Sequence, residues 1–473
     1  MNTKKLLIPV LCGLALGLGA CGGDSATEAE PVVSPFGGAS TPAMSNALIS
    51  STVLSSASVP PASNGTTAPL ASAANPAVPA QLYLDWMSYH YVTLESESSY
   101  YGSIAGGFQH VFSAAYQPAA RIIWSTAQST PYSSQCKVDD ASLPIMKFRG
   151  CTVSEGIGYG MLIAAMQNDE PTFITLWNYS RGFRAYNNNQ PLTPWITFSF
   201  TFNEIDLGSA TDADLDIATS LILMYLKTLN VAYLNDALVI AGGIWDHEVK
   251  DNMLLSGDTR MWDGTKGPIV YNLSYFSPVA LRLFAKYDTA HNWTAVLDAM
   301  YSYMATIQAG GTGVFPDWST ETYSVNPPND AAGNEKSGFT YYTFNKESVR
   351  IPWRIAWDYY WFQDPRAGVV LQTLNQFIVA KSAGDPNSAA LAVNYSWNLS
   401  IGPDNTRNTA VPAQWLAAWC ATGIGTNPTW LEACTKALNG KTVSNTASSY
   451  FPDILLVMYS QLLNGQYTRP AGI

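Results

Sequence analysis

The sequence predicts an all-α domain, a helical toroid with long loops and a few short strands around a cleft. Beyond residue 150 the apolar residues recur at helical spacing, and few segments alternate as a strand does. Many of the expected helices are apolar around most of their circumference, which suits helices packed between two layers. The loops between them are long and rich in Gly, Pro, Asn and Trp, and we find no fixed-period repeat that would build a solenoid.

The composition excludes two broad classes of protein. The 473 residues include 24 Lys and Arg against 35 Asp and Glu, which gives a formal net charge of −11, with 47% hydrophobic and 12% aromatic residues. A chain so rich in apolar and aromatic residues is not disordered as a whole. An acidic chain lacks the basic footprint that phosphate binding needs, so we expect no nucleic-acid partner.

The first 21 residues have the pattern of an export signal. A basic start and a short apolar run end in LGAC, with small residues before Cys21. This pattern is typical of a secretory signal peptide and looks like a bacterial lipobox, so we expect Cys21 to carry a lipid. The alternative is an ordinary signal whose cysteine is accidental. The expected location is therefore the bacterial cell envelope, with membrane contact through the lipid only.

Residues 22–80 are expected to form a flexible tether. They consist mainly of Ala, Ser, Pro, Thr and Gly, with one Phe and no Trp or Tyr. Such a segment cannot bury enough apolar surface to offset the entropy lost on ordering. Aromatic residues become dense from Gln81 onward. We therefore expect three parts: the signal at 1–21, the tether at 22–80 and one folded domain at 81–473, acting as a monomer.

Four cysteines remain for the folded domain once Cys12 is removed with the signal and Cys21 is lipidated. An exported chain meets an oxidising compartment, so two disulfides are expected among Cys136, Cys151, Cys420 and Cys434. Three connectivities are possible, and the sequence-local pairs are the simplest. The spacing of these cysteines is not the close Cys-x-x-Cys spacing of zinc sites. With only four histidines in the chain, we expect no metal and no cofactor.

Helical spacing places the expected helices along the domain in sequence order. They cover residues 158–168, 173–179, 212–229, 232–241, 276–287, 294–309, 352–361, 368–381, 387–397, 412–419 and 452–463. Long loops at residues 254–268 and 310–346 interrupt them, and such loops on a helical scaffold are where binding and catalysis usually lie.

Three segments concentrate carboxylates where helices are expected to begin. In TVSEGIGYGM (152–161), Ser154 is a candidate N-cap and Glu155 lies among small residues. In SATDADLDIA (209–218), Asp212 and Asp216 share one helix face and Asp214 points elsewhere. The third segment, KESVRIPWR (346–354), places Glu347 close to two arginines. Each segment also has a structural interpretation, as acids that complement a helix dipole or as a buried ion pair.

Together these segments resemble glycoside hydrolase family 8, the inverting (α/α)6-toroid endoglucanases, xylanases and chitosanases. The resemblance covers roughly residues 85–465 and includes two further motifs, NLSYFSP at 272–278 and PDW at 316–318. It implies that Glu155 is the general acid and that Asp212 binds and helps to distort the sugar at the cleavage point. It also implies that Arg350 orients the base or Asp212, and that Tyr275 lines the same subsite.

The chain departs from the family pattern at the expected general base. Many members carry an Asp three residues before the Arg of R-x-P-W-R, usually after a Tyr, whereas this chain has Glu347 after Lys346. Glutamate keeps the carboxylate but reaches one methylene further. Glu347 is therefore the first candidate for the base, and the loop acids Glu335 and Asp317 remain alternatives. Met224 and Thr228 also depart from the family signature, and we expect them to affect packing only.

The aromatic residues fit a cleft that stacks sugar rings on their faces. Loop candidates for this role are Trp124, Trp195, Trp262 and Trp318, while most other aromatic residues are expected in the core. The resemblance implies endo-acting hydrolysis of β-1,4 bonds in a polysaccharide. A cellulose-type glucan is the first choice and xylan a close second, followed by mixed-linkage glucan or chitosan. A catalytically impaired, glycan-binding surface lipoprotein is the alternative from a different class.

Overall fold

The structure is a computed structural model that describes most of the chain beyond residue 66. The described residues are 67–102, 112–124, 151–198, 200, 204–258, 264, 268–320, 342–399, 405–406, 411–446 and 449–473. Outside them lie the expected signal with Cys21, most of the tether, and the candidate residues Cys136, Trp262 and Glu335.

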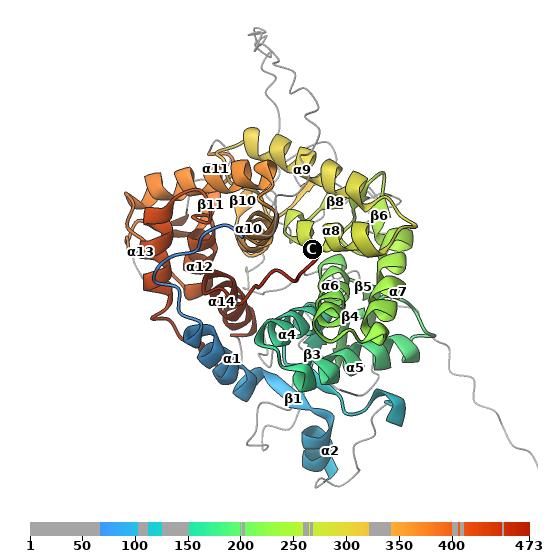
Figure 1. The fold of residues 1–473 in the computed structure, drawn as a ribbon. Helices are drawn as coiled ribbons and strands as arrows, with labels where there is room; N and C mark the ends of the chain where they lie inside the picture. Colours follow the sequence, from blue (N-terminus) through green and yellow to red (C-terminus); the bar gives the residue numbers. More distant parts are fainter. Residues whose placement is uncertain are drawn as a thin grey trace, which may run out of the picture.

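An inner ring of helices surrounds the centre of the molecule (Figure 1). In the described residues the ring consists of α4 (Ser154–Gln167), α6 (Thr211–Thr228), α8 (Pro278–Tyr287), α10 (Ile351–Phe362), α12 (Ala413–Ala421) and α14 (Tyr450–Leu463). Each inner helix packs against the next along the chain, and α14 packs back against α4. The ring is therefore closed.

A second layer of helices covers the outside of this ring. It consists of α5 (Glu170–Tyr186), α7 (Val231–Glu248), α9 (Trp293–Ala309), α11 (Pro365–Ser382), α13 (Pro428–Leu438) and α1 (Ala77–His90). Five of these pack against the inner helix that precedes them in sequence, and α1 packs against α14. Two concentric layers of helices form an (α/α)6 toroid, which confirms the predicted fold class. A further helix, α2 (Leu94–Gly102), lies outside the two layers.

Small residues allow the inner helices α4 and α6 to approach closely. A Cβ atom placed on Gly158 would lie 3.0 Å from the carbonyl oxygen of Ala213 and 3.0 Å from the Cβ of Asp216. Only glycine avoids these contacts. The close approach brings the N-terminal ends of α4 and α6 side by side.

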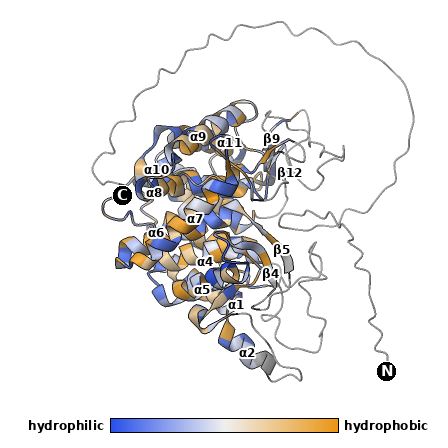
Figure 2. Cartoon of the chain, turned by 90° about the vertical axis from the view of Figure 1, so that its right-hand side faces the viewer, coloured by the Kyte–Doolittle hydropathy of each residue, from blue (hydrophilic) through white to orange (hydrophobic). Residues whose placement is uncertain are grey.

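Short antiparallel strands lie in the connections between the helices. They are β1 (Tyr91–Thr93), β2 (Ala120–Ile122), β3 (Cys151–Val153), β4 (Pro194–Phe198), β5 (Glu204–Ser209), β6 (Val249–Lys250), β7 (Met253–Leu254), β8 (Val270–Tyr271), β9 (Ser319–Thr320), β10 (Thr343–Phe344), β11 (Ala392–Ser396) and β12 (Asn405–Thr406). Strands β3 and β5 flank β4 and lead directly into α4 and α6. In the side view of Figure 2, β4, β5, β9 and β12 lie on one side of the helices and the C-terminus on the other.

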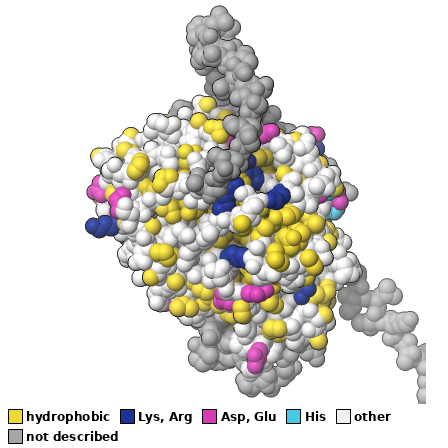
Figure 3. All heavy atoms as spheres, viewed as in Figure 1, with side chains coloured by type: hydrophobic (Ala, Val, Ile, Leu, Met, Phe, Trp, Pro, Cys, Tyr) yellow, Lys and Arg dark blue, Asp and Glu magenta, His cyan; other side chains and the backbone are white. Residues whose placement is uncertain are grey.

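The last ten residues cross the opposite end of the ring (Figure 1). Tyr467 is fully buried there, where its hydroxyl accepts a hydrogen bond from Trp353 Nε1 at 3.0 Å. Trp361 Nε1 donates to the carbonyl oxygen of Tyr467 at 2.7 Å, and Arg469 donates to that of Trp361 at 2.6 Å. This segment covers the C-terminal end of α10. Figure 3 views the molecule from this side and shows few charged side chains among apolar and neutral ones.

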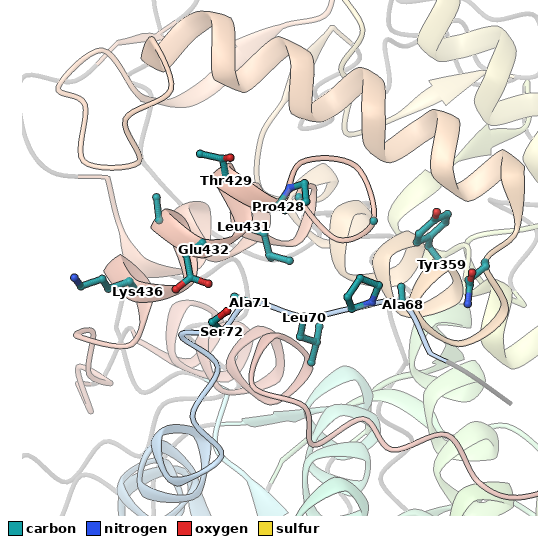
Figure 4. Close-up of a pocket in the computed structure, with 15 residues that line it drawn as sticks. Ala68, Leu70, Ala71, Ser72, Tyr359, Pro428, Thr429, Leu431, Glu432 and Lys436 are labelled. Carbon is teal, nitrogen blue, oxygen red and sulfur yellow. The ribbon is translucent and has the colours of Figure 1, made fainter.

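A groove of about 800 Å³ also lies on the side where α10 and α12 end. The first described residues, 68–72, run along it opposite α13 (Figure 4). The amide of Ala68 donates to the carbonyl of Tyr360 at 2.9 Å, and that of Ala73 to Glu432 at 3.2 Å. Residues 67–80 therefore belong to the fold, so the folded domain begins before Gln81. Hydrogen bonds hold this segment in place although it has few apolar side chains.

The expected helices agree with the structure except at one segment. Residues 387–397 were expected to be helical, but they contain β11, which pairs with β10 through Thr343 and Phe344. The alanine-rich local sequence favours a helix, and the pairing with a distant strand overrides it. Helices α1 and α13 have no counterpart among the expected helices.

A disulfide joins Cys420 at the end of α12 to Cys434 in α13 and so ties the inner to the outer layer. This is one of the two sequence-local pairs. Cys151 is also disulfide-bonded, and its expected partner Cys136 lies outside the described residues. Among the helices of the described part of the chain, none is long and apolar enough to cross a bilayer.

Candidate active site

The carboxylates singled out in the sequence converge at the N-terminal ends of the inner helices. Glu155 is the second residue of α4 and Asp212 the second residue of α6. Glu347 immediately precedes a short 3₁₀ helix, Ser348–Arg350, that leads into α10. The strands β3 and β5 end just before α4 and α6, so the sheet sets where the two acids begin.

Arg350 lies at the centre of this group. Its Nη1 donates to Asp212 Oδ2 at 3.0 Å and also to Glu155 Oε2. Its Nη2 donates to Glu347 Oε2. All four side chains are between 2% and 6% exposed, so the contacts are made away from bulk solvent. One cation is thus shared by three carboxylates, which we call the Arg350 cluster.

Burial changes the proton affinity of two of these acids. It raises the pKa of Glu155 to about 7, against the opposing effect of Arg350, while the negative charge of Asp212 raises it further. Burial likewise raises the pKa of Asp212 to about 6, and Arg350 and Arg354 oppose this rise. Because three carboxylates share one guanidinium, the Arg350 cluster retains a proton most readily on Glu155.

Glu155 has a second partner that the sequence did not reveal. The hydroxyl of Tyr450, the first residue of α14, donates to Glu155 Oε1 at 2.8 Å. The two oxygens of Glu155 are therefore held by side chains from two different inner helices, α14 and the start of α10. No motif marked Tyr450, and only the closure of α14 onto α4 brings it to the site.

Glu347 is held on one side of its carboxylate. Its Oε2 accepts from Arg350 and from Asn272 Nδ2 at 2.8 Å. Asn272 in turn accepts from the amide of Ser274 and so caps the 3₁₀ helix Leu273–Tyr275. Among the described residues, no hydrogen bond uses Glu347 Oε1. That oxygen is the one that can hold a water molecule.

The two alternative candidates for a base differ from Glu347. Asp317 Oδ1 accepts from the amides of Asn345 and Ser348, at 2.8 and 3.0 Å, and from the hydroxyl of Ser348 at 2.8 Å. Asp317 thus fixes the loop that carries Glu347. Glu335 lies outside the described residues. Through Arg350 the structure brings Glu347 to Glu155 and Asp212.

Aromatic side chains surround the guanidinium of Arg350. Its Cζ lies 5.3 Å from the ring centroid of Tyr275 and 5.8 Å from that of Phe451. Trp318, which is 3% exposed, meets Tyr275 edge-on at 6.4 Å. Sequence reasoning anticipated Tyr275 and Trp318 near the acids, and it missed Phe451.

The remaining tryptophan candidates lie elsewhere. Trp124 is 6% exposed, and its amide donates to the carbonyl of Cys151, next to β3. Trp195 lies within strand β4 rather than in a loop. Trp262 lies outside the described residues. Ser154 is also not the N-cap that the sequence suggested, because α4 begins at Ser154 and Val153 holds the capping position.

A second acid–arginine pair lies one helical turn further along α6 and α10. Arg354 donates to both carboxylate oxygens of Asp216, through Nη1 to Oδ1 and through Nη2 to Oδ2 at 2.7 Å. Both residues are fully buried or nearly so. As predicted, Asp212 and Asp216 face the same side of α6, whereas Asp214 faces the amide of Thr193 at 3.0 Å.

The Arg350 cluster contains two carboxyl groups, Glu155 and Glu347, that could act as acid and base on a substrate bond placed between them. With its pKa raised to about 7, Glu155 keeps a proton up to near neutral pH and can donate it, and Glu347 places a second carboxyl group on the same arginine. No group of three or more His, Cys, Asp or Glu in the described part of the chain has the geometry to hold a metal ion.

Comparison with known proteins identifies a family and several relatives that match part of this chain. The family model described as glycosyl hydrolases family 8 matches residues 104–422, more than half of the chain. Endoglucanase A of Acetivibrio thermocellus is 30% identical over 240 residues, 49% of this chain and 47% of its own length. A β-glucanase of Niallia circulans is 30% identical over 253 residues, 50% of this chain and 60% of its own length. The matches thus span about half of these curated relatives.

The fold also has counterparts among solved structures. The structure of a β-1,3-1,4-glucanase from Paenibacillus sp. X4 superposes with a TM-score of 0.64 at 20% identity, covering 85% of this chain and 96% of that one. At this identity the likeness shows a common fold, and it agrees with the two helical layers described above.

Proposed function

The chain belongs to family 8 of the glycosyl hydrolases, and from this premise we propose that it hydrolyses β-1,4-glycosidic bonds within a polysaccharide, with inversion at the anomeric carbon. The observation that carries the proposal is the Arg350 cluster. It holds a carboxyl group whose pKa is raised to about 7 beside a second carboxylate on the same arginine. Inverting glycosidases need this pairing of a protonated and an ionised carboxyl group.

Glu155 acts as the general acid in this proposal. Its buried carboxyl is protonated near neutral pH and donates its proton to the glycosidic oxygen as the bond breaks. Tyr450 and Arg350 hold its two oxygens and so fix the direction of transfer. Burial supplies the high pKa, because a carboxylate is poorly stabilised away from water.

Glu347 acts as the general base. Asn272 and Arg350 hold its Oε2, and Oε1 orients a water molecule for attack on the opposite face of the sugar ring. Inverting enzymes place the two carboxyl groups about 6.5–9.5 Å apart to make room for this water.

Asp212 and Tyr275 form the subsite for the sugar at the cleavage point. Asp212 Oδ1 accepts from the amide of Ala213 at 2.9 Å, which orients the carboxylate toward Arg350. Its negative charge stabilises the oxocarbenium-like charge that develops on the sugar. Tyr275 and Phe451 flank the guanidinium and provide apolar surface for a ring face. Trp318 supports Tyr275 from its edge.

A cellulose-type glucan is the first choice of substrate. The curated relatives of about 30% identity carry the names endoglucanase and β-glucanase, which supports a glucan. Xylan is the close alternative, followed by mixed-linkage glucan and chitosan, because family 8 includes enzymes that act on such polymers. A glycan-binding protein without turnover is the other class of candidate, motivated by Glu347 and Lys346 at the usual Asp and Tyr positions. Contact of Glu347 with Arg350 supports the enzyme.

We further propose that the protein is exported and held at the cell envelope by a lipid on Cys21. The LGAC sequence and the Ala/Ser/Pro/Thr-rich segment after it support this proposal. Labelling with radioactive palmitate is expected for the full chain and not for Cys21→Ala. Label that persists in Cys21→Ala would exclude this lipid site.

The decisive experiment measures reducing-sugar release from carboxymethylcellulose, xylan, mixed-linkage glucan and chitosan. The chain is expected to act on at least one of them, and Glu155→Gln is expected to lose turnover by about 10²–10⁴-fold while still binding the same polymer. Glu95→Gln is the matched control, since Glu95 is exposed on α2. No release from any polymer, with binding to one retained, would favour the glycan-binding alternative.

A further inference from the structure

A second pair of acids lies behind Asp212, between helices α6 and α7. Asp214 of α6 and Glu248 at the end of α7 are both fully buried. Asp214 Oδ1 accepts from the amide of Thr193 at 3.0 Å, and Glu248 Oε1 accepts from Ser209 Oγ at 2.5 Å. Neither side chain takes part in the Arg350 cluster, and the reaction proposed above does not use them.

Each of these carboxyl groups has one oxygen without a hydrogen-bond partner. Among the described residues, no hydrogen bond of good geometry reaches the buried Asp214 Oδ2 or Glu248 Oε2, and the hydroxyl of Thr211 faces Glu248. A buried acceptor left without a donor is costly, and a buried carboxylate without a compensating charge is far more so. Two such oxygens on neighbouring acids indicate that a proton between them completes the arrangement.

Among the described residues, no cation forms a direct ion pair with Asp214 or Glu248. Arg184 of α5 is the positive group that faces Asp214, and its Nη2 is already paired with Asp236 at 2.5 Å. The other charged groups that face the pair, Asp212 and Asp258, are acids. Asp258 accepts from the amide of Ser209 at 2.8 Å. Two ionised carboxylates would therefore face each other in a low-dielectric interior.

We propose that Asp214 and Glu248 share one proton, as a carboxylic acid hydrogen-bonded to a carboxylate, and that this acid pair positions Asp212. The pair joins the end of α7 to the start of α6. Ser209, the last residue of β5, is bonded to Glu248 by its hydroxyl, and Asp212 follows three residues later. Asp214 and Glu248 are thus positioning residues, and their effect on Asp212 rests on the proposed function of that residue.

The direction of the pKa shifts agrees with this assignment. Burial raises the pKa of both Asp214 and Glu248 well above the usual values, and the charge of Asp214 raises that of Glu248 further. A bound divalent cation would be the other way to neutralise the pair.

Infrared difference spectroscopy between the chain and its variants tests the shared proton without any need for catalysis. The wild type is expected to show the carbonyl stretch of a protonated carboxyl group at about pH 8, above the pKa of Glu155. Asp214→Asn and Glu248→Gln are each expected to lose it, and Glu95→Gln to keep it. An amide can donate to the remaining carboxylate, so both variants are expected to fold.

The pH dependence of the melting temperature is the second readout. A carboxyl whose pKa is raised on folding stabilises the fold at low pH, and this stability is lost as the pH rises through the raised pKa. As the pH rises from the usual carboxyl pKa toward the raised one, the melting temperature of the wild type is therefore expected to fall more steeply than that of Asp214→Asn.

Three results would overturn the proposal. The first is an infrared band that neither variant removes, and the second is an equal pH slope in wild type and Asp214→Asn. The third is a melting temperature that falls on treatment with EDTA and recovers with calcium, which would show a cation in place of the proton. Absence of turnover alone would count against the proposed function and would leave these readouts intact.

Discussion

Two arginines four residues apart at the start of α10 serve two different purposes. Arg354 is bound through two nitrogens to one carboxylate, Asp216, so its charge is balanced. Arg350 is shared by Glu155, Asp212 and Glu347, so the cluster around it carries more negative than positive charge. A balanced pair holds helices together, whereas an unbalanced cluster retains a proton that chemistry can use.

The largest expected effect concerns the base within the unbalanced cluster. Glu347→Gln is expected to lower kcat by about 10²–10⁴-fold, because the amide cannot accept the proton of the attacking water. Asp317→Asn is the matched comparison, since Asp317 binds the backbone of the same loop. Asp317→Asn is expected to lower the free energy of unfolding but to leave kcat closer to the wild-type value than Glu347→Gln does. If Asp317→Asn or Glu335→Gln abolishes turnover and Glu347→Gln does not, the base is wrongly assigned.

The balanced pair is expected to matter for stability. Arg354→Met leaves the fully buried Asp216 without its partner, and breaking a buried pair in this way costs about 3–5 kcal/mol. Denaturant unfolding of Arg354→Met and wild type measures this difference. Arg350→Met is the comparison that is expected to lose turnover. An unchanged unfolding free energy in Arg354→Met would remove the distinction between the two arginines.

A smaller effect is expected on the pKa of Glu155. The negative charge of Asp212 raises that pKa, so Asp212→Asn is expected to bring it below about 7. Since a general acid works only while protonated, the wild-type rate is expected to fall about tenfold per pH unit above this pKa. Carbon-13 NMR titration of the glutamate carboxyl groups, with Glu155→Gln for assignment, measures the shift. An unchanged or raised pKa would contradict the coupling of these two acids.

The smallest expected effect concerns the close contact between α4 and α6, which brings Glu155 and Asp212 together. Gly158→Ala places a Cβ atom 3.0 Å from the carbonyl oxygen of Ala213, so α4 and α6 must separate slightly. We expect a loss of about 1–3 kcal/mol in unfolding free energy, as for other overpacked sites. Gly242→Ala in α7 is the control, because no atom lies within 4 Å of a Cβ there. Equal stability in both variants would show that this contact is unimportant.

Sequence reasoning reached the fold class and all four residues of the Arg350 cluster. Local patterns marked the carboxylates Glu155, Asp212 and Glu347, and a motif marked Arg350. Helical periodicity is a local property, so most helices could be placed from it. The helix predicted at residues 387–397 is wrong because this segment pairs with β10, which is distant in sequence. Helices α1, α2 and α13 were also missed.

Tyr450, Phe451 and Asn272 show why the rest of the site was out of reach. Tyr450 meets Glu155 across 295 positions of sequence, and only ring closure between α14 and α4 brings them together. Asn272 lies within a motif that the sequence did single out, but its contact with Glu347 depends on how two loops pack. Contacts of this kind belong to the tertiary structure and leave no local pattern.

The measurement that tests the central claim most directly is proton NMR of the freshly formed product from a β-1,4-linked oligosaccharide that the chain cleaves. An acid at Glu155 and a water-holding base at Glu347 predict that the α-anomer appears first and then mutarotates. Initial formation of the β-anomer would show a covalent, retaining route and would contradict the assignment of the two carboxyl groups.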